Sequence, residues 1–199
     1  MKLIPENLVG RRVILASKSP RRKELLSLIC KDFEIMPADI DESVPCEIDR
    51  KDAAEYTAKR KCLAISEKKE CSDTVVIACD TIVLVDDEIL GKPKDYEDGF
   101  SMLRKLSGKE HSVISGVAIS FKGKMMSFSQ TSRVRFFDLT DEEIGDYLDS
   151  GEPFDKAGGY GIQGIGSLLV EGFEGDFFNI VGLPIARLRK ELARLLEEE

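Results

Sequence analysis

The chain of 199 residues has a single histidine, His111, and none of its five cysteines forms a CxxC pair. Zinc sites and histidine-assisted nucleophiles need clusters of these residues, so both kinds of chemistry have little material here. An odd cysteine number also argues against a disulfide framework and favours reduced thiols in the cytoplasm. We therefore expect His111 to be structural and the chemistry to depend on carboxylates, lysines, arginines and a bound divalent metal.

Long apolar runs are missing as well. The longest, residues 74–85, is interrupted by Asp80, and the first residues include no apolar run of signal-peptide length. A net charge of -8 argues against general binding to nucleic acid or to anionic membranes, which usually requires a basic surface. We expect a cytoplasmic protein that binds neither a nucleic acid polymer nor a membrane, with residues 1–199 forming one domain.

Hydrophobic periodicity and capping signals predict an α/β fold. Strands are expected at residues 12–16, 33–36, 74–85, 112–120, 125–137 and 167–170. Helices are expected at residues 20–28, 49–69, 95–108 and 140–151, and from residue 184 onward. The strands at 112–120 and 125–137 are separated by a short turn, which makes them candidates for antiparallel partners.

The first helix begins with two cations, Arg21 and Arg22, directly after a strand. Ser19 is a good N-cap and Pro20 suits the first helical position, which places both arginines in the first turn. That turn exposes unpaired N–H groups and the positive end of the helix dipole, so cations are unfavourable there unless an anion binds among them. The pattern indicates a phosphate-binding turn; the alternative is that both side chains point into water.

Lys61 and Asp80 are ionisable residues in apolar surroundings. Lys61 falls on the same helical stripe as Ala54, Ala58 and Ile65, so it projects from a face expected to pack inward. A stem that snorkels to solvent is the alternative. Asp80 needs a polar partner within this apolar run. It could hydrogen-bond to a turn, bind a metal ion, or act as a base that orients water.

Three more charges could join such a site. Lys92, between Gly91 and Pro93, could meet a phosphate as a compact point charge. Asp41 and Glu42 follow the second strand and offer the hard oxygen ligands that magnesium or manganese prefers. Taken singly, each of these residues is usually a surface charge.

Gly159, Gly161 and Gly164 satisfy the pattern GxGxxG, but the context does not suit a dinucleotide-binding fold. Such a fingerprint lies between a strand and a helix, whereas this one precedes the strand-like residues 167–170, and no Walker A pattern is present. We expect the glycines to allow a tight backbone passage beside a ligand. Gln163, the only side-chain amide of this stretch, offers the donor and acceptor needed to read a pyrimidine edge.

Several blocks along the chain resemble, in order, those of the Maf family, the septum-formation-inhibitor-like nucleotide pyrophosphatases. They are LASKSPRRKELL (15–26), CDTIV (79–83), GKP (91–93), LSGKEHSVISGV (106–117), DKAGGYGIQG (155–164) and VGLP (181–184). The resemblance implies a mixed twisted sheet with flanking helices and two lobes around a cleft, similar to the inosine triphosphate pyrophosphatases, and a homodimer. It also implies hydrolysis of a nucleoside triphosphate to the monophosphate and pyrophosphate with a divalent cation, magnesium or manganese.

The same resemblance implies roles for individual residues. Asp80 matches the proton acceptor that activates water, and Glu42 with Asp80 would hold the metal. The phosphate-binding positions fall on Ser17, Arg21, Arg22, Lys61 and Lys92. Positions linked to substrate choice fall on Arg21, Thr81 and Gln163, a combination similar to the dTTP and UTP branch rather than the 7-methyl-GTP branch. Cys79 stands where this family suggests alanine, which makes it a candidate for redox sensitivity beside the base.

The sequence leaves two other functions open. One is a purine pyrophosphatase acting on inosine triphosphate, disfavoured because the first strand leads into SKSPRR (17–22) rather than that family's Asn- and Lys-bearing loop. The other is a regulator of septum formation that binds nucleotide without turnover.

Overall fold

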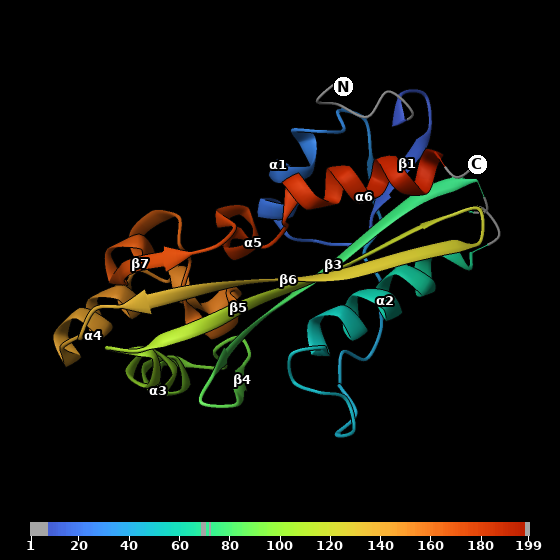
Figure 1. The fold of residues 1–199 in the computed structure, drawn as a ribbon. Helices are drawn as coiled ribbons and strands as arrows, with labels where there is room; N and C mark the ends of the chain where they lie inside the picture. Colours follow the sequence, from blue (N-terminus) through green and yellow to red (C-terminus); the bar gives the residue numbers. More distant parts are fainter. Residues whose placement is uncertain (1–7, 69–70, 72, 198–199) are drawn as a thin grey trace. The chain divides into compact units, whose positions relative to one another are not determined.

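The computed structural model describes residues 8–68, 71 and 73–197 (Figure 1). The chain divides into two compact units. Unit 1 comprises Met1–Asp80, Ser115–Gln130 and Gly182–Glu199, and unit 2 comprises Thr81–Ile114 and Thr131–Val181. Within the described residues, none of the helices combines the length and apolar character needed to cross a membrane. A single domain over 1–199 stays a prediction.

In the part of the chain that the structure describes, seven strands form one mixed sheet, which confirms the α/β class. They are β1 (Arg12–Leu15), β2 (Glu34–Ile35), β3 (Thr74–Val85), β4 (Glu88–Leu90), β5 (Glu110–Phe121), β6 (Lys124–Phe136) and β7 (Val170–Glu174). The order is β2-β1-β3-β5-β6-β7, with β4 paired to β3. β1 runs parallel to β2 and β3, whereas β4 runs antiparallel to β3 and β7 antiparallel to β6. Strands β3, β5 and β6 each continue from one unit into the other.

Tight two-residue turns account for two of the strand pairings. Asp86 and Asp87 join β3 to β4 with φ of 47° and 61°, and Lys122 and Gly123 join β5 to β6 with φ of 48° and 77°. Positive φ at both central residues matches the twist of a hairpin, which favours this turn despite its strain on residues other than glycine. The predicted pairing of the two strands around residues 112–120 and 125–137 is thereby confirmed.

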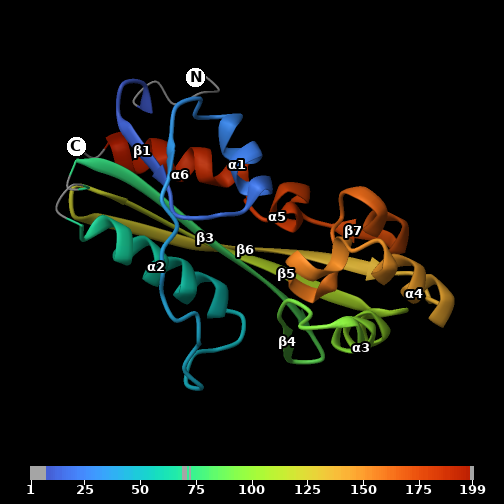
Figure 2. The ribbon, with the colours of Figure 1, turned by 180° about the vertical axis from the view of Figure 1, so that it is seen from behind.

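Unit 1 places helices on both faces of its part of the sheet. Helix α2 (Ala53–Ser66) covers one face, and α1 (Pro20–Ser27) and α6 (Ile185–Glu197) cover the other, as Figures 1 and 2 show. α2 approaches β5 very closely, because a Cβ added to Gly116 would lie 2.2 Å from the backbone carbon of Ala54. Only glycine fits there, so this contact fixes the height of α2 above the sheet.

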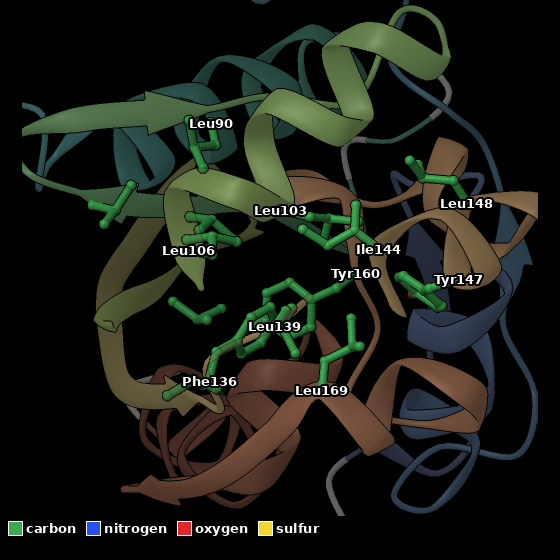
Figure 3. Packing of buried hydrophobic residues seen from close by; sticks show 14 residues of the cluster. Leu90, Leu103, Leu106, Phe136, Leu139, Ile144, Tyr147, Leu148, Tyr160 and Leu169 are labelled. Carbon is green, nitrogen blue, oxygen red and sulfur yellow. The ribbon is translucent and has the colours of Figure 1, made fainter. Parts of the chain in front are cut away.

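Unit 2 contains α3 (Tyr96–Leu106), α4 (Asp141–Asp149), α5 (Phe177–Val181) and short 3-10 helices that include η3 (Glu152–Asp155) and η5 (Gly164–Leu169). Its core joins β-strand residues such as Phe136 to helix residues such as Leu103 and Ile144 (Figure 3). α4 begins with a capping box: the Thr140 hydroxyl accepts from the Glu143 N–H, and the Glu143 carboxylate accepts from the Thr140 N–H.

Most expected ranges differ from the observed ones by one or two residues at an end, and three elements need comment. The predicted helix 49–69 begins only at Ala53, because the Asp49 carboxylate accepts the Lys51 N–H at 2.8 Å and forms a turn first. α2 ends at Ser66, and residue 69 lies outside the described residues. The strand expected at 33–36 is reduced to Glu34–Ile35. Residues 167–169, expected as strand, finish the 3-10 helix η5, and β7 starts at Val170.

His111 is a buried core residue, as predicted, with 3% of its surface exposed. Its Nε2 lies 2.7 Å from the Tyr160 hydroxyl, and the ring meets Phe136 and Tyr160 edge-on. Its Nδ1 has no hydrogen-bond partner among the described residues. The ring therefore packs as a neutral aromatic group.

Burial lowers the pKa of His111 from 6.5 to about 4, and this shift predicts how stability depends on pH. The unfolded chain takes up a proton before the folded chain does, so the free energy of unfolding should fall between pH 6.5 and 4. Between pH 7.5 and 5 the loss from this group should be about 2 kcal/mol, measured by urea unfolding. His111→Phe should remove this component; an unchanged pH dependence in that variant would exclude the explanation.

Candidate functional site

The turn from Ser17 to Arg22 has the local structure expected from its sequence. The Ser19 hydroxyl accepts the Arg22 N–H at 3.5 Å and caps α1, and Pro20 takes the first helical position. Ser17, which is buried, accepts the Ser19 N–H at 3.2 Å through its own hydroxyl. Both hydroxyls therefore hold the backbone at the positive end of the helix dipole.

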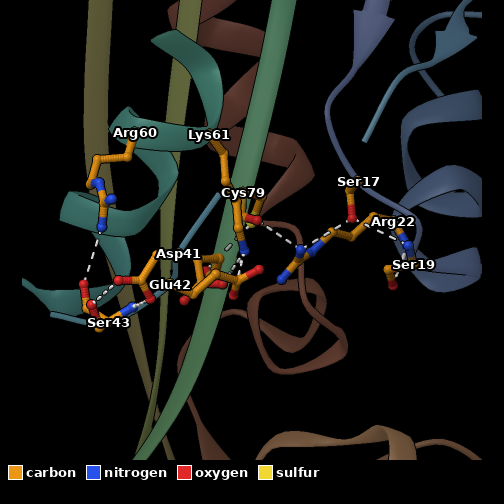
Figure 4. Close-up of polar contacts among 10 residues, drawn as sticks. Ser17, Ser19, Arg22, Asp41, Glu42, Ser43, Arg60, Lys61 and Cys79 are labelled. Carbon is orange, nitrogen blue, oxygen red and sulfur yellow. Dashed lines mark hydrogen bonds and ion pairs between the residues drawn. The ribbon is translucent and has the colours of Figure 1, made fainter. Parts of the chain in front are cut away.

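Arg22 does not point into water. Its Nη1 donates to the Cys79 carbonyl at 2.7 Å and to the Ser17 hydroxyl at 3.2 Å (Figure 4). Its Nε donates to the Gly182 carbonyl at 3.0 Å. These acceptors carry partial negative charge, which offsets the unfavourable position of a cation in the first helical turn. The guanidinium thus connects α1 to β3 and to the segment before α6.

Lys61 is the centre of the charged group in unit 1. Its Nζ lies 2.8 Å from Asp80 Oδ1 and 2.9 Å from Glu42 Oε2, and only 9% of its side chain is exposed. α2 supplies Lys61, β3 supplies Asp80, and the loop after β2 supplies Glu42. Figure 4 shows Lys61 extending from α2 towards Glu42. The predicted inward projection of Lys61 is confirmed, and the snorkelling alternative is excluded.

The two carboxylate side chains that contact Lys61 differ in solvent exposure. The Asp80 side chain is 17% exposed, whereas that of Glu42 is 57% exposed. The buried ammonium and the Asp80 carboxylate must compensate each other, because leaving one of such a pair alone costs about 3–5 kcal/mol. Glu42 pairs with Lys61 from the solvent side. Breaking this ion pair costs less free energy, because water can solvate the exposed carboxylate.

The carboxylates of Glu42 and Asp80 have the chemistry of a magnesium or manganese site, since both offer hard oxygen ligands. The Lys61 ammonium lies within 3 Å of both and already compensates their charge, so a metal ion would have to share these carboxylates with it. Among the described residues no three His, Cys, Asp or Glu side chains form a cage that could hold a metal. Two carboxylates supply only part of a magnesium ligand shell, whose other ligands are commonly oxygens of water or phosphate.

Two neighbours take no part in this charged group. Both Asp41 carboxylate oxygens accept hydrogen bonds from Ser43, one from its N–H at 2.9 Å and one from its hydroxyl at 2.5 Å, and these bonds lower the pKa of Asp41. Cys79 is fully buried, and its Sγ donates to the Gly182 carbonyl at 3.2 Å. Such burial removes the access that an oxidant needs, so the structure does not favour the suggested redox sensitivity.

The remaining predicted residues have different surroundings. Arg21 is half-buried in α1 within unit 1. Thr81 follows Asp80 along β3 and is half-buried, whereas Lys92 and Gln163 are exposed. These last three belong to unit 2. The structure therefore brings together Ser17 with Arg22, and Lys61 with Glu42 and Asp80, within unit 1.

Three groups were not predicted from the sequence. The Gly182 carbonyl, which accepts from both Arg22 and Cys79, is a backbone acceptor and leaves no side-chain signal. The other two are Tyr147 and Glu152 beside the glycine-rich stretch, which hydrogen-bond each other at 3.1 Å. The available signal for Glu152 was a carboxylate that precedes several glycines in the sequence. Glycine has no side chain to cover its backbone N–H group.

Known proteins are similar to this chain over nearly its whole length. The family model described as Maf-like protein matches residues 12–195. The dTTP/UTP pyrophosphatase of Thermosipho africanus is 52% identical over 177 residues, which cover 89% of this chain and 90% of that protein. The dTTP/UTP pyrophosphatase of a Geobacillus species is 47% identical over 185 residues, which cover 93% and 98%. The structure of the Staphylococcus aureus Ham1 protein is similar with a TM-score of 0.46 at 15% identity, over 80% of each chain.

The Arg22 contacts predict a stability effect that charge alone does not explain. Arg22→Lys keeps the charge but loses the planar fork that reaches three acceptors, so the free energy of unfolding should fall by about 2 kcal/mol. Arg194→Lys, at an exposed ion pair on α6, should change it by less than about 0.5 kcal/mol. Urea unfolding of both variants measures this, and equal values for the two would refute a bracing role for Arg22.

Proposed function

The chain belongs to the family of Maf-like proteins, and on this premise we propose that it hydrolyses nucleoside triphosphates, dTTP and UTP foremost, to the monophosphate and pyrophosphate. The observation that carries the proposal is its 52% identity to a dTTP/UTP pyrophosphatase over 89% of the chain. The charged group around Lys61 supports it, because phosphoanhydride hydrolysis depends on charge compensation and on a positioned carboxylate.

In this proposal the triphosphate binds at the turn that begins α1. The Ser17 hydroxyl and Arg21 offer donors to phosphate oxygens, and the positive end of the α1 dipole favours an anion at this place. Arg22 shapes the turn through its three backbone and hydroxyl contacts. Lys61 and Lys92 neutralise the phosphate charge as compact ammonium groups.

Asp80 is the proposed base. Its carboxylate orients a water molecule and takes its proton while the water oxygen bonds to the α-phosphorus. The bond between the α-phosphorus and the bridging oxygen breaks, and pyrophosphate leaves with the electron pair. Lys61 holds Asp80 Oδ1 at 2.8 Å, which fixes the carboxylate before the substrate arrives.

Glu42 and Asp80 would hold the divalent cation, magnesium or manganese, which when bound supplies positive charge against the phosphate oxygens. Base selection is assigned to Arg21, Thr81 and Gln163, the three positions that resemble those of the dTTP and UTP branch. The Gln163 amide has the donor and the acceptor that a pyrimidine edge requires. We place the reaction in the cytoplasm, a proposal that the five free cysteines support.

The base role of Asp80 has a direct test. Asp80→Asn keeps an acceptor for Lys61 but cannot take a proton, so turnover should fall at least about a hundredfold while the protein stays folded. The measurement is pyrophosphate release from dTTP, UTP, CTP, ITP and 7-methyl-GTP with magnesium or manganese. Asp73→Asn, just before β3, is the control with an exposed carboxylate.

Selective turnover of dTTP and UTP that is lost only in Asp80→Asn would support the proposal through to the chemical step. Full activity of Asp80→Asn would remove Asp80 from the mechanism. Nucleotide binding by the folded wild-type protein without any turnover would refute the enzymatic function.

We also propose that the chain forms a homodimer. Four large apolar side chains of unit 2, Ile165, Leu168, Phe173 and Phe178, are 38–75% exposed and come from η5, β7 and α5. Apolar exposure of this extent on one segment often indicates an association surface. Sedimentation equilibrium at micromolar concentration should give twice the chain mass of 22.2 kDa. A mass equal to one chain would contradict the dimer.

A further inference from the structure

The glycine-rich segment of unit 2 presents one amide side chain to solvent. Gln163 is exposed, precedes η5 as its N-cap residue and makes no side-chain capping bond. Ile162, directly before it, is buried, and so is Gly166, three positions after it. The amide side chain is therefore exposed, although buried residues lie before and after it in the sequence.

Glu152, at the start of η3, holds the segment after Gln163. Its Oε2 accepts the N–H of Ile165 at 3.0 Å, and its Oε1 accepts the N–H of Gly166 at 3.1 Å. One carboxylate therefore binds two consecutive N–H groups at the beginning of a 3-10 helix, where they have no partner within that helix. Charge-assisted bonds of this kind are about twice as strong as neutral ones.

Tyr147, on α4, holds the segment before Gln163. Its hydroxyl accepts the N–H of Gly161 at 3.2 Å and donates to Glu152 Oε1 at 3.1 Å. The ring is buried in the core of unit 2 (Figure 3), and this burial raises the pKa of the hydroxyl, so it stays a donor at neutral pH. Tyr147 thus connects the two ends of the segment through the Glu152 carboxylate.

Glycines make this close arrangement possible. A Cβ on Gly166 would lie 2.4 Å from the Gly161 carbonyl oxygen and 2.6 Å from the Tyr147 hydroxyl. Gly164 has a φ of 73°, and a Cβ there would lie 2.7 Å from Glu152 Oε2. The backbone of residues 161–166 is therefore folded tightly around the two side-chain groups, while the Gln163 side chain stays exposed.

We propose that Glu152 and Tyr147 are positioning residues that fix the Gln163 amide for selection of a pyrimidine base. This inference rests on the proposed function, in which Gln163 reads the base. Hydrogen-bond discrimination between a carbonyl and an amino group requires donor and acceptor to be held in place, because a side chain on a loosely held loop adapts to either. Both positioning residues belong to unit 2, whereas the proposed base Asp80 belongs to unit 1.

The experiment compares Glu152→Gln and Tyr147→Phe with wild type, using UTP and CTP as substrates. UTP and CTP differ at the base edge, where UTP has a carbonyl and CTP an amino group. The Glu152→Gln substitution keeps the size of the side chain but leaves an amide that cannot accept both N–H groups, and Tyr147→Phe removes the hydroxyl. The ratio of kcat/KM for UTP to that for CTP should fall about tenfold, mainly through KM for UTP, with kcat changed less than about threefold.

Three further measurements separate positioning from simple loss of stability. Thr140→Ala removes the capping box of the same helix, α4, without touching residues 161–166, so it should lower stability and leave the selectivity ratio unchanged. Combining Glu152→Gln with Gln163→Ala should lower the ratio no further than Gln163→Ala alone. Hydrogen exchange of the Ile165 and Gly166 amides should accelerate about tenfold in Glu152→Gln.

The outcomes are distinct. A wild-type ratio in folded Glu152→Gln and Tyr147→Phe, or an equal loss for both nucleotides, would overturn the positioning role while leaving the proposed function intact. If Glu152→Gln does not fold, Tyr147→Phe alone decides. A wild-type protein that hydrolyses neither nucleotide would overturn both the function and this inference.

Discussion

The buried ammonium of Lys61 is the charge on which the rest of unit 1 depends. It brings β3, α2 and the loop after β2 to one point, because Asp80 and Glu42 both approach it within 3 Å. Neither Lys61 nor Asp80 could be kept in apolar surroundings alone. The close contact of Gly116 with α2 and the bracing of β3 by Arg22 are then conditions that keep these elements at the required separation.

Much of this arrangement could be predicted from local sequence patterns. The apolar stripe with Ala54 and Ala58 placed Lys61 on an inward face, and an interrupted apolar run identified Asp80 as a residue that needs a partner. Neither pattern could identify that partner, because the two residues are 19 positions apart and belong to different elements. Pairing across elements depends on how α2 packs on the sheet, which is decided by contacts such as that of Gly116.

The parts that could not be predicted depend on backbone groups. Two cations in the first turn of α1 indicated an anion site, yet Arg22 meets carbonyl oxygens that lie 57 and 160 positions further along the chain. Residues 167–169 have a strand-like composition, but Glu152 captures the N–H groups just before them and a 3-10 helix forms instead. Acceptors and donors of the main chain are present at nearly every residue, so composition gives no sign of which ones are used.

The interleaving of the two units has a consequence for biosynthesis. Unit 1 needs residues 115–130 and 182–199 in addition to its first eighty, so it cannot close while the ribosome has made only the first half of the chain. Arg22 has no Gly182 carbonyl to bind until that residue has been synthesised. β1 likewise leaves the ribosome long before α6, which covers it, has been made. The early segment must therefore remain soluble while incomplete, and folding is expected to be largely post-translational and slowed by its many distant contacts.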